Sequence, residues 1–179
     1  SIRRQRQMCI RDSPWNWMNQ ADVMRNADRH TDALALLEQA LRIDPEHAES
    51  WAKLGQVYRD LHQYPRALEA YQQAIRLKPA YGWAQNGYGL VLKIMGNPQE
   101  AILAFKRAAR YEPKEVWHWY NITELLVEMR QYEEALQPAQ ESVRVDPKHA
   151  FSWAKLGQVM RYLRRLEESL KAYHRATEL

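Results

Sequence analysis

The sequence predicts an all-α protein, a solenoid of about ten helices that pack as antiparallel pairs. Three observations predict this fold class. Prolines that each close a similar phrase recur at one constant interval, at Pro45, Pro79, Pro113 and Pro147. A segment of eight residues occurs at 50–57 and again at 152–159, three such periods later. Apolar residues recur at helical spacing, whereas the strict alternation typical of half-buried strands is absent.

The period divides the body of the chain into five units, each expected to contain two helices. Their bounds are 14–47, 48–81, 82–115, 116–149 and 150–179, the last being four residues short. Such units bury their apolar faces only against their neighbours, so the stack as a whole supplies the core. We therefore interpret residues 14–179 as one repeat domain and number positions within each unit from its first residue.

The first two units define the helical pattern. In the first unit, Trp17 marks the first helix. In the second unit, Trp51, Leu54 and Tyr58 lie at i, i+3 and i+7, which places them on one helical face. A second apolar face follows, and Pro79 then ends the helix pair, because proline lacks an N–H and disfavours helix at the preceding residue.

The remaining units follow the same plan with local changes. In the third unit, Asn97 and Pro98 predict the start of the second helix, as N-cap and first-turn proline. In the fourth unit, Pro138 falls inside the second helix, where it removes one backbone hydrogen bond. We interpret Pro138 as a tolerated bend, with a functional hinge as the alternative. The fifth unit repeats the Trp-containing segment of the second.

The second unit resembles the signature of the tetratricopeptide repeat at all eight landmark positions. These residues are Trp51, Leu54, Gly55, Tyr58, Ala67, Tyr71, Ala74 and Pro79. The other units keep parts of the signature, and the fourth departs from it most, at Thr123, Ala139 and Ser142. The resemblance spans residues 14–179. It implies a right-handed superhelix whose concave groove binds a peptide or a partner protein and needs no cofactor.

In this family the groove is lined by the first helix of each repeat. Positions two and four of a helix differ by about 200°, so Trp117 and Trp119 face opposite ways. We assign the tryptophans at position four to the core: Trp17, Trp51, Trp119 and Trp153. The groove candidates are then Trp83, Asn86, Leu90, Lys93, Ile94, Trp117, Tyr120, Glu124, Val127, Phe151, Gln158, Arg161 and Tyr162. Exposed aromatic residues with polar neighbours are typical of interface hot spots.

Two alternatives stay open for the aromatic residues among these candidates. Their rings could pack on adjacent repeats, or Trp83 could replace the core tryptophan that is missing at Gln85. Two partner codes of the family are incomplete. No unit has the Lys and Asn pair, at positions five and nine, with which chaperone-binding members clamp a carboxylate. The asparagine ladder of sugar-transferase arms is reduced to Asn19 and Asn121.

Residues 1–13 differ from the rest of the chain. They hold four of the 26 basic side chains and one of the 22 acidic ones, so residues 14–179 carry 22 and 21. Residues 3–12, which include the only cysteine, Cys9, resemble a translated sequencing-library adapter. We expect residues 1–13 to be a non-native or disordered tail. The near-neutral body offers no electrostatic footprint for nucleic acid, and no apolar run approaches the roughly 18 residues of a membrane span.

The functional prediction is a non-catalytic protein–protein interaction module in the cytoplasm. The six histidines include no helix-spaced metal pair, and no glycine loop suits a phosphate, so no catalytic, metal or cofactor residue is predicted. The expected partner is a protein or peptide, not a nucleic acid or a membrane. The alternative is the regulatory arm of a larger enzyme of glycosyltransferase, sulfotransferase or kinase type. Self-association through an uncapped C-terminal end is also expected.

Overall fold

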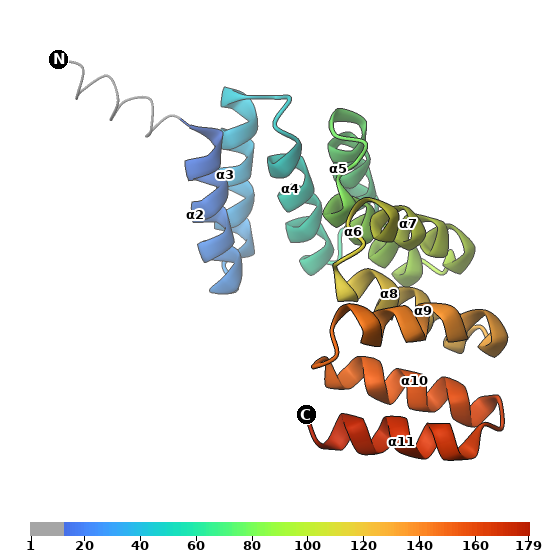
Figure 1. Cartoon of the computed structure of the whole chain (residues 1–179). Coiled ribbons are helices and arrows are strands. Elements are labelled where there is room, and N and C mark those ends of the chain that lie inside the picture. Colours follow the sequence, from blue (N-terminus) through green and yellow to red (C-terminus); the bar gives the residue numbers. More distant parts are fainter. Residues whose placement is uncertain (1–12) are drawn as a thin grey trace. The chain divides into compact units, whose positions relative to one another are not determined.

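The structure, a computed structural model, describes residues 13–179. Within that range the chain forms ten α-helices and no strand, which confirms the all-α class. Each predicted repeat contributes two helices. The predicted tail, with residues 3–12 and Cys9, lies outside the described residues except for Ser13. In chain order the helices (Figure 1) are α2 (Pro14–Asn26), α3 (His30–Ile43), α4 (Ala48–Asp60), α5 (Tyr64–Leu77), α6 (Gly82–Ile94), α7 (Pro98–Tyr111), α8 (Val116–Glu128), α9 (Tyr132–Val145), α10 (Ala150–Tyr162) and α11 (Leu166–Thr177).

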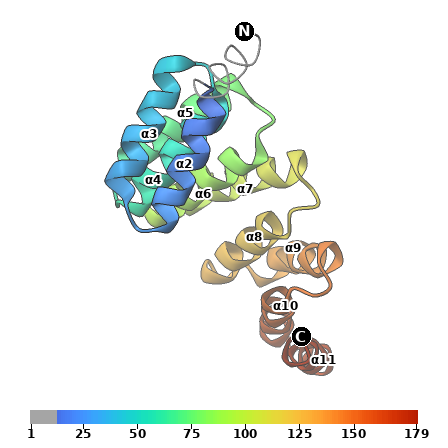
Figure 2. The ribbon, with the colours of Figure 1, turned by 90° about the vertical axis from the view of Figure 1, so that its left-hand side faces the viewer.

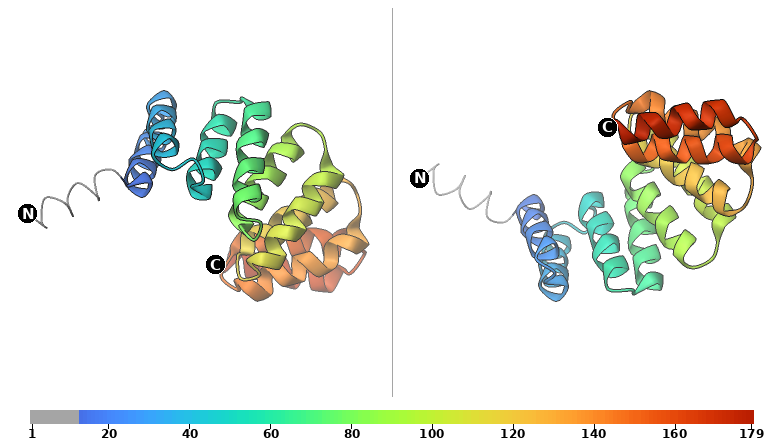
Figure 3. Two further views of the ribbon diagram at one scale, coloured as in Figure 1. Left: turned by 90° about the horizontal axis from the view of Figure 1, so that it is seen from above. Right: turned by 90° about the horizontal axis from the view of Figure 1, so that it is seen from below.

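The chain divides into two compact parts, Ser1–Met95 and Gly96–Leu179. The terms first unit and second unit denote these two parts below, and the five shorter segments predicted from the sequence are called repeats. In the first unit the helices from α2 to α6 pack each on the next, and α4 also contacts α2 and α6 (Figure 3). In the second unit the helices from α7 to α11 do the same, and α8 also contacts α10 (Figure 2). The first helices of neighbouring repeats therefore lie side by side within each unit.

The turn between the two helices has a left-handed residue at the same position in all five repeats. In four of these turns a backbone N–H donates to the carbonyl five residues earlier, at 2.8–2.9 Å, which is the bond of a Schellman motif. Because only one of the five turns carries glycine at its left-handed residue, the other four accept the steric cost of a Cβ there. That residue, at position 15, has a φ of 56° at Asp28, 58° at His62, 79° at Gly96, 60° at Arg130 and 62° at Arg164.

Tyr71 lies at the centre of the first unit's core. Its side chain is 1% exposed and lies between Gly55 of α4 and Gly87 of α6. A Cβ at Gly55 would lie 2.9 Å from Tyr71 Cδ2, and a Cβ at Gly87 would lie 2.7 Å from Tyr71 Oη and nearer still to the ring. Burial raises the pKa of Tyr71 to about 12. The glycines, with the fully buried Ala67 and Ala74, let the helices approach as expected.

The local helix predictions are confirmed in position but not in every detail. Helix α5 ends at Leu77, before Pro79. Helix α7 begins at Pro98 with Asn97 at the N-cap, although the Asn97 side chain makes no capping hydrogen bond. Helix α9 continues through Pro138, whose side chain is buried. The proline therefore lies within one helix rather than between two.

The assignment of the position-four tryptophans to the core holds only in part, because all four are half-buried. Three of them use the indole Nε1–H to bind the proline carbonyl six residues earlier, which ties the first helix to the loop before it. The bonds are Trp51 to Pro45 at 2.8 Å, Trp119 to Pro113 at 3.1 Å and Trp153 to Pro147 at 3.0 Å.

Candidate partner-binding surface

An aromatic cluster joins α8 and α10 in the second unit. The Trp117 ring centroid lies 5.8 Å from that of Tyr120 and 4.8 Å from that of His149, both in edge-on geometry. The His149 ring in turn lies 5.9 Å from Phe151. We name Trp117, Tyr120, His149 and Phe151 the α8–α10 aromatic surface. Three of its four members are groove candidates from the sequence.

Helix periodicity and capping position these rings. Trp117 and Tyr120 are three residues apart on α8, so they share a face. His149 is the N-cap residue of α10, and its Nδ1 lies 2.7 Å from Ser152 Oγ. This contact holds the imidazole at the start of α10, where the ring meets Trp117 at position two of the fourth repeat. The His–Ser contact therefore orients the ring against which Trp117 packs.

The α8–α10 aromatic surface remains open to solvent despite its internal contacts. Trp117 is 50% exposed and Phe151 is 66% exposed. Two large aromatic side chains exposed within one cluster of rings are unusual on a protein surface without a binding role. Aromatic residues are also enriched among the side chains that dominate interface energetics. The arrangement thus offers apolar area that a partner can bury.

Paired charges border this surface. The Tyr120 hydroxyl donates to Glu124 Oε1 at 3.4 Å, and Lys155 Nζ lies 3.5 Å from the same oxygen. Lys155 Nζ also lies 5.8 Å from the centroid of the Tyr120 ring. The border is therefore polar, with its two opposite charges close together.

Helix α8 also carries a buried histidine, His118. His118 is 3% exposed, and its Nε2 lies 3.3 Å from Glu112 Oε2. Burial lowers the pKa of His118, and the neighbouring Glu112 opposes that shift only in part. Since the pKa falls below the ordinary value of about 6.5, this imidazole is neutral at pH 7 and contributes no charge to the surface.

The other candidates of the second unit lie in different surroundings. Tyr162 is 42% exposed and stacks on Tyr132 of α9 at 4.2 Å, with the Arg161 guanidinium 5.1 Å from the Tyr162 centroid. Gln158 is half-buried. Val127 is 9% exposed and belongs to the core.

In the first unit, Trp83 packs against its neighbours. Its ring lies 6.4 Å from Tyr71 and 6.0 Å from Tyr81, and Lys53 Nζ lies 4.9 Å from its centroid. Gln85 is itself 4% exposed at its own position. These contacts support packing on adjacent helices. Ile94, another candidate in this unit, is 52% exposed. The remaining candidates there are half-buried: Asn86, Leu90 and Lys93.

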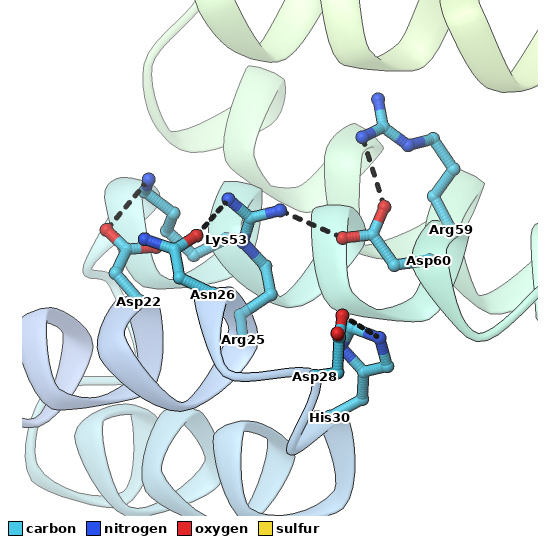
Figure 4. A network of polar contacts seen from close by, with 8 residues as sticks. All are labelled: Asp22, Arg25, Asn26, Asp28, His30, Lys53, Arg59 and Asp60. Atoms are coloured by element: carbon cyan, nitrogen blue, oxygen red, sulfur yellow. Dashed lines mark hydrogen bonds and ion pairs between the residues drawn. The ribbon is translucent and has the colours of Figure 1, made fainter.

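The charged residues of the first unit pair with one another between α2 and α4 (Figure 4). Lys53 Nζ lies 2.9 Å from Asp22, and Arg25 donates to Asp60 at 3.0 Å. Asp60 also accepts from Arg59 at 3.1 Å. These cations are therefore paired with carboxylates within the unit.

The first unit repeats the ring contact of the second, three periods earlier. Trp15 lies edge-on to His47 at 4.7 Å, and His47 Nδ1 lies 2.7 Å from Ser50 Oγ. His149 and Lys155 are not among the groove candidates that the sequence predicts. The repetition of Trp, His and Ser three periods apart was the available signal.

No group of three or more His, Cys, Asp or Glu side chains within residues 13–179 is arranged to hold a metal ion. None of the described helices has both the length and the apolar character that a bilayer crossing requires.

Comparison with known families identifies tetratricopeptide repeats along most of the chain. Family models with that description match residues 12–80, 52–115 and 89–150. A search of curated protein sequences finds no match.

Solved structures of other proteins share the fold. The structure described as "Functional Characterization of Pseudomonas Aeruginosa pilF" has a TM-score of 0.86 at 18% identity, covering 92% of this chain and 75% of that one. MamA from Desulfovibrio magneticus RS-1 has a TM-score of 0.78 at 18% identity, covering 94% and 95%. YrrB, described as a TPR protein with an unusual peptide-binding site, has a TM-score of 0.71 at 22% identity, covering 94% and 87%. Identities this low show the shared fold alone.

Proposed function

This chain belongs to the tetratricopeptide repeat family, and we propose that it is a non-catalytic interaction module whose α8–α10 aromatic surface binds a peptide or a partner protein. The observation that carries the proposal is the joint exposure of Trp117 and Phe151, at 50% and 66%, within one cluster of rings. Burying two such side chains supplies the apolar contact on which interface hot spots depend.

Preorganisation strengthens this surface. The His149 ring is oriented by Ser152 and contacts Trp117, Tyr120 and Phe151. Aromatic rings already held by neighbours lose little conformational freedom when a partner binds, so more of the contact energy appears as affinity.

The chemistry of the surface points to a partner with apolar or aromatic anchor residues. Glu124 and Lys155 lie against each other at the border, so they suit a partner's polar groups more than an isolated charge. The fold likeness to YrrB, described as having an unusual peptide-binding site, supports a peptide as a ligand class.

The proposal is tested with a protein that combines Trp117→Ala and Phe151→Ala. We expect capture of a specific binding protein from a cell extract to be lost, because both exposed anchors are removed, while the helical circular dichroism is unchanged. Trp15→Ala is the matched control, since Trp15 occupies the same repeat position, is 51% exposed and also lies against a histidine.

The control protein is expected to capture the same partner as the unchanged protein. Undiminished capture by the double variant would contradict the proposal. So would equal loss in the Trp15→Ala control, because the partner would then not distinguish the two equivalent tryptophans.

We also propose that α11 supports self-association. Leu166 and Leu170 are four residues apart on this helix and are 59% and 61% exposed. Their equivalents in the second repeat, Tyr64 and Leu68, are half-buried against the core of the first unit. Sedimentation of the Leu166→Glu, Leu170→Glu protein should show a smaller species at the same concentration, and an unchanged sedimentation coefficient would contradict this.

A further inference from the structure

The two units contain crevices of the same construction. In the first unit it lies between α3, α4 and α5, with Trp51, Leu54 and Ala70 in its lining and a volume of about 470 Å³. In the second unit it lies between α7, α8 and α9, with a volume of about 270 Å³. Eight lining residues of the two crevices correspond at a shift of two repeat periods.

The second crevice, which we name the α7–α9 crevice, is separate from the α8–α10 aromatic surface. Trp119 lines it, whereas Trp117 belongs to the aromatic surface. Two residues of separation on a helix rotate these tryptophans by about 200°. A ligand in the crevice therefore contacts the opposite side of α8.

The apolar side of the crevice centres on Trp119. The Trp119 Nε1–H is bonded to the Pro113 carbonyl, so the indole offers the crevice its carbon surface. Ile122, Leu126 and Pro138 complete the apolar lining. Pro138 stands where the first crevice has Ala70, and its larger ring contributes to the smaller volume. The helix-internal proline thus has a place in the lining of a crevice.

The charges around the two crevices differ. In the first crevice Glu38 and Glu69 balance Arg42 and Arg66, and both arginines donate to a glutamine three residues earlier on the same chain.

At the equivalent positions of the α7–α9 crevice, Lys106 corresponds to Glu38, Arg110 to Arg42, and the neutral Gln137 to Glu69. Within residues 13–179 the side chains of Lys106 and Arg110 make no hydrogen bond or ion pair. Both lie on α7, one helical turn apart and on one face. Among the residues that line the crevice, Glu134 in the first turn of α9 is the one acidic side chain, so the α7 side of the crevice is positive.

Size restricts what the crevice holds. Pockets for drug-sized molecules have volumes of roughly 300–1,000 Å³, and this crevice is slightly smaller, at about 270 Å³. It therefore fits one bulky side chain better than a whole cofactor. Its unpaired cations on one side complement carboxylates beside that side chain.

We propose that the α7–α9 crevice binds one aromatic or branched apolar side chain of an acidic peptide segment, with the flanking carboxylates against Lys106 and Arg110. This site is additional to the α8–α10 aromatic surface. Glu134 repels carboxylates on the α9 side and so fixes the orientation of the segment.

The test uses three blocked pentapeptides in which tryptophan stands between pairs of glutamate, glutamine or lysine. Each is titrated into the full chain to about 5 mM, because one anchor side chain supports only weak binding. The readout is the NMR signal of each indole N–H in the protein. We expect the glutamate peptide to shift the Trp119 signal most and to leave the Trp51 signal in place, so that the first crevice is an internal control.

The charge contribution is tested with Lys106→Glu, Arg110→Glu. This protein should bind the glutamate peptide about tenfold more weakly and should prefer the lysine peptide. Equal Trp119 shifts with all three peptides, equal shifts of Trp51, or no Trp119 shift by the end of the titration would overturn the proposal. A shift confined to Trp117 would also overturn it while leaving the proposed function intact.

Discussion

Gly87→Ala is the substitution to which the packing of the first unit is most sensitive. The added Cβ would lie 2.7 Å from Tyr71 Oη and closer to two ring carbons. The ring is 1% exposed, and Gly55 confines it from α4, so it has no free space into which to move. Helix α6 must therefore shift away from α5.

Two opposing terms decide the size of the effect. Overpacking of a filled core costs about 1–3 kcal/mol, and the upper end applies where neither helix can yield. Replacing glycine by alanine inside a helix returns about 1 kcal/mol. We expect a net loss of about 2 kcal/mol, which corresponds to a fall in Tm of about 4–8 °C for a chain of this size.

The assay is urea unfolding followed by circular dichroism. Gly157→Ala is the matched control, because its Cβ would lie 3.1 Å from Tyr173, which is half-buried and able to yield. In the protein that also carries Tyr71→Leu, the two losses should not add, since leucine lacks the clashing ring atoms. Full stability of Gly87→Ala, or strict additivity in the double variant, would refute the reasoning.

Two further predictions follow from local features. The unfolded pKa of His118 is about 6.5, and burial lowers the folded pKa. The unfolded state therefore binds more protons, and stability falls as pH drops through and below 6.5. The Tm of His118→Gln should fall less than that of the unchanged protein between pH 7.5 and pH 5, and parallel curves would contradict this. Arg164 has a φ of 62°, so Arg164→Gly should raise the free energy of unfolding by about 0.5–1 kcal/mol, with glycine relieving the Cβ strain, and a destabilised protein in thermal unfolding would contradict it.

The fold was predictable because the sequence of each repeat contains the signals that predict its two helices. Proline spacing and the helical spacing of residues such as Trp51 and Tyr58 are local signals, and the neighbouring repeat supplies the same pattern again. The left-handed turn was less visible. Only Gly96 signals it in sequence, whereas Asp28 and Arg130 adopt it because the Schellman bonds and helix packing require it.

The candidate surface was predictable only in part, for a physical reason. Helical geometry gives the face of Trp117 but not the ring that meets it, because His149 comes from the end of the repeat, beyond the helix that carries Trp117. Val127 was placed in the groove from its helix position alone, but its side chain is 9% exposed and lies in the core. The α7–α9 crevice depends on three helices together, so no single-helix pattern reveals it.

The most direct test of the central claim is site-specific photocrosslinking with benzoylphenylalanine in place of Phe151. Val23 on α2 is the comparison position, since it is 62% exposed, close to the 66% of Phe151, and lies in neither proposed site. If the α8–α10 aromatic surface binds the partner, the probe at Phe151 will crosslink the protein that the unchanged chain captures, and the probe at Val23 will not. Crosslinking of that partner from Val23 alone, or equally from both positions, would contradict the account.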